Sequence, residues 1–207
     1  GDVYKRQGHS SSERKIVPQS DKASPAEIHQ TLSLLLAQLT LRPAHREHLR
    51  SPKRGLSDEQ IESLGFKSTP PPFLCRSITD RLIKQGCRVQ GVPGFYRDDS
   101  GHWTMAFYKK TSGILIPAIG FDGRLQGFQI MLDVPLKHKD DPPEKPGAKY
   151  IWFSSSSKTD GTGSGSPVHL IGDPSARVVY VIEGLLKADI YHCLTAVSYT
   201  HLTLPTT

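Results

Sequence analysis

The feature that most constrains the fold of this chain is an uninterrupted β-branched and aromatic run, Val178-Val179-Tyr180-Val181-Ile182, followed at once by Glu183 and Gly184. A run without a polar face is typical of a strand that is covered on both sides, as in the parallel sheet of an α/β domain. Gly184 allows a tight turn into the helical pattern Leu185 to Ile190. Because such sheets carry their chemistry at the carboxyl ends of strands, Glu183 is a candidate catalytic carboxylate, with a purely structural strand end as the alternative.

Both ends of the chain resemble translated sequencing adapter. One short DNA element encodes Asp-Val-Tyr-Lys-Arg-Gln near the start, and its reverse complement, read out of frame, encodes Val-Ser-Tyr-Thr-His near the end. We therefore expect residues 1–7 and 196–207 to be adapter-derived artefacts that carry no fold information. On this hypothesis, residues 8–195 are an internal fragment of a longer protein, interrupted just after the Glu183 motif.

The composition favours one domain with a hydrophobic core and an extension in 207 residues. Hydrophobic residues make up 36% of the chain, the mean hydropathy is −0.38, and no stretch approaches the ~18 apolar residues of a membrane span, which predicts no membrane contact. The three cysteines are widely spaced and form no Cys-x-x-Cys pair, which favours buried thiols in a reducing, cytoplasmic setting. A formal net charge of +6 permits a nucleic-acid partner without requiring one.

Residues 8–23 are polar and serine-rich, which predicts a disordered linker, and residues 24–90 form a predicted helical N-terminal region. Capping boxes at Ser24 and Ser57 predict the starts of two helices, the second ending at Gly65. A third helix is expected from Ser77 to Gln85. The apolar positions expected to face the core in the first and third helices are Leu32, Leu35, Leu36 and Leu39, and Ile78, Leu82 and Ile83.

A basic segment lies between the first two capped helices. It sets seven basic side chains against the single acid Glu47: Arg42, His45, Arg46, His48, Arg50, Lys53 and Arg54. One interpretation is an arm that contacts DNA phosphates through Arg46, Arg50 and Arg54, and the other is a solvated helix face. The two histidines have no nearby cysteine or further histidine, so they predict no metal site.

Residues 91–175 change to an extended pattern and form a predicted β-rich region. Strands are expected over 103–108, 113–119 and 125–132, with turns at 98–101 and 122–123, so the sequence predicts an antiparallel β-meander. Further strands are expected over 149–153 and 168–171. The Ser/Gly loop over 154–166 is either a flexible connector or a phosphate cradle, but it lacks the Gly-Lys-Ser/Thr ending and following helix of a P-loop.

Four segments in this order resemble the catalytic core of bacterial DNA primases. They are Gly113-Ile114-Leu115-Ile116-Pro117, Asp122-Gly123-Arg124-Leu125-Gln126-Gly127-Phe128, Lys149-Tyr150 and Val181-Ile182-Glu183-Gly184. The last of them resembles the first strand of the Toprim domain. A closer resemblance, over roughly Ala23 to Thr195, is to a Toprim-like domain of uncharacterised function in primase-helicase proteins of phages and mobile elements. It rests on Arg54-Gly55-Leu56-Ser57, Leu74-Cys75-Arg76-Ser77-Ile78, Val92-Pro93-Gly94-Phe95-Tyr96, Lys149-Tyr150-Ile151-Trp152, Gly165-Ser166-Pro167-Val168-His169 and Glu183-Gly184-Leu185-Leu186-Lys187-Ala188-Asp189.

The resemblance implies an α/β fold in which a truncated Toprim-like domain, beginning over residues 176–195, is preceded by N-terminal helices and an antiparallel β-meander. It implies metal-dependent nucleotidyl transfer by the parent protein, in which Mg²⁺ bridges nucleotide phosphates, with DNA, nucleotides and a helicase region or partner. Glu183 would hold the metal or act as acid/base, since Mg²⁺ prefers carboxylate oxygens. Arg124 and Lys149 would contact phosphates, or would be ordinary exposed side chains at strand edges.

Two departures from the Toprim pattern leave the activity open. Lys187 stands where many Toprim proteins have an acid, which exchanges a metal-compatible side chain for a phosphate-compatible one. The Asp-x-Asp metal ligands are expected on the next strand, beyond residue 195, and Asp140-Asp141 precedes the motif and cannot replace them. The alternatives are therefore an inactive piece of a primase-like enzyme, a non-catalytic nucleic-acid-binding module, and a small-molecule α/β enzyme that uses Glu183 but leaves the basic segment unexplained.

Overall fold

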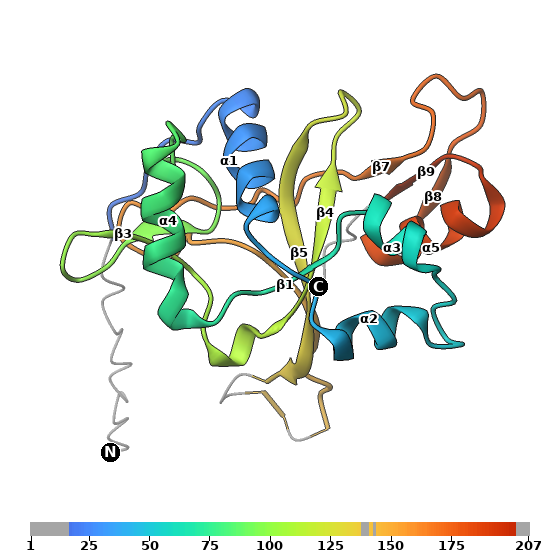
Figure 1. Ribbon diagram of the computed structural model, residues 1–207, viewed down its shortest axis with the longest axis horizontal. Helices are drawn as coiled ribbons and strands as arrows, with labels where there is room; N and C mark the ends of the chain where they lie inside the picture. The colour runs from blue at the N-terminus through green and yellow to red at the C-terminus, as the bar shows by residue number, and fades with distance from the viewer. Residues whose placement is uncertain (1–16, 138–140, 143, 202–207) are drawn as a thin grey trace, which may run out of the picture.

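A four-stranded antiparallel sheet forms the centre of the molecule (Figure 1). The computed structural model describes residues 17–137, 141–142 and 144–201. The strand order is β1-β4-β5-β6, with β1 at Lys67–Ser68, β4 at Gly113–Ile119, β5 at Leu125–Leu136 and β6 at Ala148–Trp152. Helices cover both faces of this sheet, so the predicted class of helices combined with an antiparallel sheet is confirmed.

The meander consists of β4, β5 and β6, each antiparallel to the next. The predicted turn at Asp122 and Gly123 joins β4 to β5, and Gly123 has φ +73°, a conformation that glycine adopts without strain. The predicted strand over 125–132 is longer than expected because β5 continues to Leu136, where it pairs with Ala148.

The strand predicted over 103–108 does not join the meander. Instead β3 (Trp103–Met105) pairs with β2 (Phe95–Arg97), and the predicted turn over 98–101 connects them. The prediction failed because this turn folds β3 back onto the strand before it. A 3₁₀ turn, η2 (Lys109–Thr111), then separates β3 from β4, and the short strand β1 takes the place beside β4.

Helix α1 (Pro25–Ala37) packs against β5 on one face of the sheet, and α4 (Cys75–Lys84) packs beside it against α1 and β3 (Figure 1). Both halves of the capping box at Ser24 are present, as predicted. The core on this face includes Leu32 and Leu82, which are fully buried, and burial of each contributes about 1.5–3 kcal/mol. The prediction for Ile83 is wrong, since it is 40% exposed: it follows Leu82 directly and so points away from the stripe that Leu82 shares with Ile78.

The opposite face is covered by α2 (Pro43–Arg50), α3 (Asp58–Ser63) and α5 (Leu185–Thr195). Its core joins Leu49, Ile61 and Leu186 from the helices to Ile114 and Met131 from the sheet. Successive β4 residues alternate between the two cores, since Ile114 lies in this one and Leu115 in the other. This explains why β4 reads as an apolar run without a polar face.

A second, smaller sheet follows in the order β7-β9-β8, with β7 at Leu170–Ile171, β8 at Tyr180–Ile182 and β9 at Tyr199–His201. Strands β8 and β9 are parallel, as expected of an α/β unit, and α5 connects them. The strand β9 lies inside residues 196–207, the segment that we expect to be adapter-derived.

The prediction that the 178–182 run is buried on both sides is wrong. Val178 is 62% exposed and Val181 is 60% exposed. Within the described residues β8 pairs with β9 alone, and α5 packs against β4, β7 and β9. The run therefore forms an exposed sheet edge, although its strand character was predicted correctly.

Residues 18–23, at the end of the predicted linker, are hydrogen-bonded to the Ser/Gly loop. The Asp160 N–H donates to the Pro18 carbonyl at 2.8 Å, and the Ser20 N–H donates to the Gly161 carbonyl at 3.1 Å. Within the loop, the Ser155 hydroxyl donates to the Phe95 carbonyl and accepts from the Thr162 N–H. These bonds therefore occupy part of the N–H and hydroxyl groups that a phosphate cradle would use.

Two of the three thiols, Cys75 and Cys87, are buried and unpaired, as predicted. Burial raises the pKa of Cys75 to about 11, which keeps this thiol protonated and unreactive at neutral pH. None of the helices that the structure describes combines the length and hydrophobicity needed to cross a membrane.

Candidate nucleic-acid interface

Arg54 is held against the central sheet by the turn that follows α2. The N–H groups of Arg54 and Gly55 both donate to the Ser51 carbonyl at 2.8 Å, and Gly55 takes φ +70°. The Arg54 Nη2 lies 3.4 Å from the Tyr150 hydroxyl and 3.7 Å from Met131 Sδ. Tyr150 and Met131 are register partners on β6 and β5, so the sheet fixes the floor beneath the guanidinium.

Lys149 and His48 extend this site. The Lys149 ammonium lies 5.9 Å from the centroid of the Tyr150 ring, within the range of a cation–π contact. Burial lowers the pKa of His48, and the positive charges of Arg54 and Lys149 lower it further. His48 is therefore neutral at pH 7 and can exchange hydrogen bonds without adding charge.

We call His48, Lys53, Arg54, Lys149 and Tyr150 the Arg54 cluster. Among the residues that the structure describes, no carboxylate lies within 4.0 Å of the charged nitrogens of Lys53, Arg54 or Lys149. The Arg54 Nε is buried and has no hydrogen-bond acceptor there. Uncompensated positive charge is what an anionic ligand would neutralise.

The other two predicted phosphate contacts of the basic segment are paired with acids. Arg46 contacts Asp58 at 2.6 Å and Glu62 at 3.5 Å, and Arg50 contacts Glu47 at 3.4 Å and Asp58 at 3.8 Å. The hydrogen bond from Arg46 lowers the pKa of Asp58, which keeps the carboxylate ionised. The pairs with Asp58 and Glu62 connect α2 to α3, and the Arg50–Glu47 pair lies within α2, so a phosphate would have to compete with all of them.

Arg42 and His45, at the start of the basic segment, bind other parts of the protein. His45 Nε2 lies 2.7 Å from Asp133 Oδ1, and His45 Nδ1 lies 2.8 Å from the Ser68 hydroxyl. Arg42 donates to the other oxygen of Asp133 at 2.9 Å. This network ties the first turn of α2 to β1 and β5 and leaves both basic side chains committed to protein partners.

Arg124 and Lys149 are not brought together. Arg124 lies in the turn between β4 and β5, where its guanidinium contacts Asp122 at 2.8 Å. Lys149 neighbours Tyr150, which pairs with Met131, six residues along β5 from Leu125. Those six residues span about 20 Å of strand, so the two predicted phosphate contacts belong to different ends of the sheet.

Glu183 and Lys187 lie together at the start of α5. Gly184 has φ +94°, its carbonyl accepts from the Ala188 N–H, and α5 begins at Leu185, so the predicted strand-Glu-Gly-helix structure is confirmed. The side chains of Glu183 and Lys187 are 78% and 57% exposed, and their charged groups are 3.8 Å apart. The carboxylate thus faces an ammonium group at the surface.

These residues do not fit a magnesium site by themselves. Mg²⁺ needs hard oxygen ligands, and a cation beside Glu183 opposes its binding. The described part of the chain holds no cluster of three or more His, Cys, Asp or Glu side chains that could hold a metal ion. Glu183 could therefore contribute at most one ligand.

Sequence reasoning missed a buried, hydrogen-bonded His–Asp pair beneath α5. His169 Nε2 lies 3.0 Å from Asp189 Oδ1, with 2% and 3% of the two side chains exposed. Nδ1 of the same ring accepts from the Ile119 N–H at 3.0 Å. Burial raises the pKa of Asp189 despite this hydrogen bond. The signal was the position of Asp189, four residues after Leu185 on the buried side of the helix.

The fold of the described residues, with helices on both faces of a four-stranded antiparallel sheet followed by a strand-Glu-Gly-helix unit, is similar to part of the catalytic core of bacterial DNA primases. The RNA polymerase domain of the Mycobacterium tuberculosis primase DnaG, in complex with a double-stranded DNA oligomer with a 6-nucleotide overhang, matches with a TM-score of 0.59 and 18% identity over 90% of this chain and 56% of that domain. The Aquifex aeolicus primase, with its zinc-binding and RNA polymerase domains, matches with a TM-score of 0.56 and 14% identity over 87% of this chain and 43% of the other. The chain thus spans about half the length of these relatives. No protein-family model matches it, and neither does any curated protein.

Proposed function

We propose that this chain is a primase-like replication module that binds DNA and nucleotide phosphates through the Arg54 cluster. The observation that carries this proposal is the pairing of Arg54 with the Lys149-Tyr150 segment, in a place without carboxylate partners among the described residues. The likeness to a primase domain solved with DNA supports it.

The side chains of the cluster suit a single-stranded polyanion. Arg54 offers a planar fork that can donate two hydrogen bonds to one phosphate, and Lys149 offers a point charge. The Tyr150 ring beside them could stack on a base, an interaction that does not depend on base identity. We therefore propose sequence-tolerant binding in which phosphate contacts supply most of the affinity.

We further propose that the parent protein is a cytoplasmic primase of a mobile genetic element that works with a helicase region or partner. In this protein, residues 91–175 would be the β-rich part of the core, and residues 176–195 would begin a Toprim-like domain. Primer synthesis would then require Mg²⁺ ligands in addition to Glu183. The second candidate is a non-catalytic nucleic-acid-binding module, and the ammonium of Lys187 beside Glu183 favours it.

Single-stranded DNA binding by Arg54→Ala and Arg124→Ala tests the proposed interface. Fluorescence anisotropy with a labelled oligothymidylate should show about a tenfold loss of affinity for Arg54→Ala, and the salt slope should fall by about 1 because one phosphate contact is lost. Arg124→Ala is the matched control, since it removes the same charge from a side chain paired with Asp122. Equal losses for the two variants would reject the Arg54 cluster as the interface.

The catalytic proposal needs a separate test in the complete protein. Glu183→Gln should abolish primer synthesis and leave DNA binding intact, because it removes a metal ligand without altering the Arg54 cluster. Primer synthesis at the unmodified rate would exclude Glu183 from the reaction. If the unmodified protein itself binds DNA but synthesises no primer, that result would support the non-catalytic module.

A further inference from the structure

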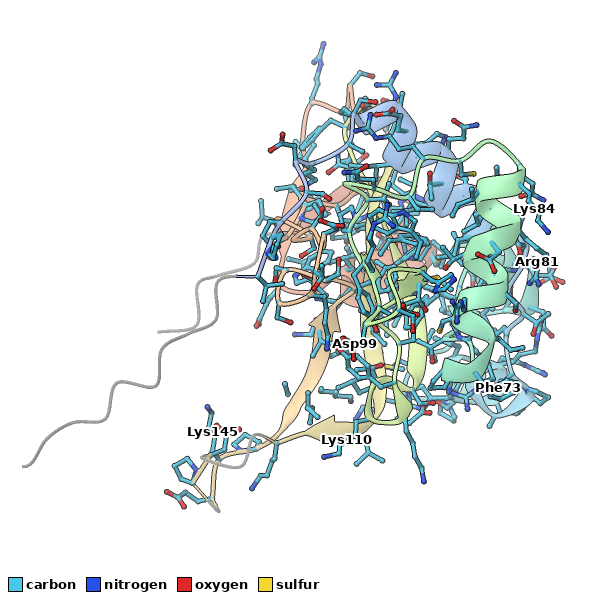
Figure 2. The ribbon with its side chains drawn as sticks, turned by 90° about the vertical axis from the view of Figure 1, so that its left-hand side faces the viewer. Phe73, Arg81, Lys84, Asp99, Lys110 and Lys145 are labelled. Atoms are coloured by element: carbon cyan, nitrogen blue, oxygen red, sulfur yellow. The ribbon has the colours of Figure 1, made fainter. Side chains whose placement is uncertain are left out.

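A cavity of about 790 Å³ opens beside the edge strand β1, away from the residues of the Arg54 cluster. It lies between the end of α1, the segment Pro70 to Leu74 with its 3₁₀ turn η1 (Pro72–Leu74), the first turns of α4, and η2. Its volume is in the range of sites that hold a small molecule or a short peptide segment. Figure 2 shows Phe73 and Arg81 on the same side of the molecule, with Lys84 farther along α4.

One wall of this cavity is apolar and rigid. The consecutive prolines over 70–72 have fixed φ angles and no N–H donors, so they present hydrocarbon that cannot rearrange easily. Phe73 is 81% exposed and Tyr108 is 47% exposed, and both line the cavity. Two aromatic rings at the mouth of an apolar cavity are suited to covering an apolar side chain of a ligand.

The other wall carries the polar side chains of Arg81 and Gln38. Arg81 Nε donates to Gln38 Oε1 at 2.8 Å, which fixes the orientation of that amide. The other end of the amide, Gln38 Nε2, is buried and has no partner in the described part of the chain. Because Gln38 Nε2 is shielded from solvent, the guanidinium of Arg81 is the polar group that this wall offers to a ligand.

The charges around the cavity have one sign. Arg42, Arg81 and Lys109 line it, and none of its lining residues is Asp or Glu. Arg42 is paired with Asp133, whereas no carboxylate among the described residues lies within 4.0 Å of the charged groups of Arg81 or Lys109. The cavity therefore complements a ligand that carries both carboxylates and an apolar group.

We propose that this cavity binds an acidic peptide segment of a partner protein, anchored by one apolar side chain. The anchor packs between the prolines and Phe73, and flanking carboxylates pair with Arg81 and Lys109. A peptide fits better than a nucleic-acid strand, because a strand requires a row of cations along its phosphates and this wall offers two unpaired ones beside hydrocarbon. The site shares no lining residue with the Arg54 cluster.

Fluorescence anisotropy on the full chain tests the charge contacts. The probe is a short fluorescein-labelled peptide with aspartates flanking a Leu-Phe pair. Arg81→Glu should weaken binding by about tenfold, the loss that corresponds to ~1.4 kcal/mol. Lys84→Glu is the matched control, since it reverses one charge on the same helix at a residue outside the cavity lining, and it should change the affinity less than about twofold.

A second pair of variants tests the apolar anchor. Phe73→Ser should weaken peptide binding by a similar factor, whereas Phe121→Ser, at an exposed phenylalanine in the β4–β5 turn, should not. Both phenylalanines are exposed, so neither change should prevent folding. Equal losses in either pair of variants, no binding by the unmodified chain, or preferential binding of oligothymidylate at this site would overturn the proposal.

Discussion

The His169–Asp189 pair lets the cost of a buried polar contact be worked out atom by atom. Nδ1 of the ring accepts from the Ile119 N–H, so the ring proton that is donated to Asp189 is on Nε2. Asp189→Leu leaves one buried donor, Nε2–H, without an acceptor and should cost about 1–3 kcal/mol of unfolding free energy. His169→Leu leaves both the carboxyl group and the Ile119 N–H without partners and should cost about 3–5 kcal/mol.

The double variant His169→Leu/Asp189→Leu distinguishes this account from simple loss of packing. It leaves only the Ile119 N–H unpaired, so it should be destabilised by about 1–3 kcal/mol, well below the sum of the single changes. Urea unfolding followed by tryptophan fluorescence measures these differences. With a slope near 2 kcal/mol per molar, each 2 kcal/mol moves the midpoint by about 1 M. His102→Leu, at an exposed histidine, is the control, and additive losses in the double variant would refute the reasoning.

Three further predictions follow from single side chains. Burial raises the pKa of Asp189 above its ordinary 3.8, so protonation of Asp189 stabilises the fold fully below pH 3.8, and this stabilisation is lost as the pH rises through the higher folded-state pKa. The unfolding free energy of the unmodified chain, compared with that of Asp189→Asn by urea unfolding across pH 3 to 8, should therefore fall as the pH rises. A difference between the two proteins that does not change with pH would contradict this prediction. Gly94→Ala should lower the midpoint temperature of unfolding, since a Cβ at φ +90° would lie 2.2 Å from the Phe153 ring. An unchanged midpoint in a thermal scan would show that the Phe153 ring moves to make room for the methyl group. Ellman's reagent should modify Cys193 in the folded chain but leave Cys75 protected until urea is added, because the pKa of Cys75 is about 11; prompt reaction of Cys75 would show that its burial is transient.

The parts of the fold that were predicted from the sequence depend on neighbouring residues. The capping boxes at Ser24 and Ser57, the turn at Asp122 and Gly123, and the Glu183-Gly184 junction each involve groups within a few positions of one another. Their geometry follows from local side-chain chemistry, so the same residues adopt it in most surroundings.

Pairing between distant strands could not be derived in this way. The two-residue strand β1 has too little pattern to be recognised, yet it supplies the edge beside β4. The exposure of Val178 and Val181 depends on which elements cover β8, and the run itself reads the same in a buried strand and at an edge. Strand type was therefore predictable, and strand environment was not.

In the candidate site, too, some features could be predicted from the sequence and others could not. Lys149 and Arg54 were singled out separately, but their proximity follows from the contact between Arg54 and Tyr150, 96 positions apart in sequence. The acid partners of Arg46 come from the following helix, and the packing of α2 against α3 selects them. The sequence shows which residues are charged, but the tertiary structure determines which of those charges are paired with an acid.

The exposed edge of β8 also bears on how the protein behaves at high concentration. Tyr180 and Val181 are more than half exposed, and β8 is paired on one side only within the described residues. A short run with strong β propensity, no charge and unpaired main-chain groups is a template on which strands of other molecules can add. The tendency of this chain to self-associate is therefore governed by the segment from Val178 to Ile182 more than by its net charge. A single Val181→Lys substitution would place a charge on the exposed edge and should reduce this association.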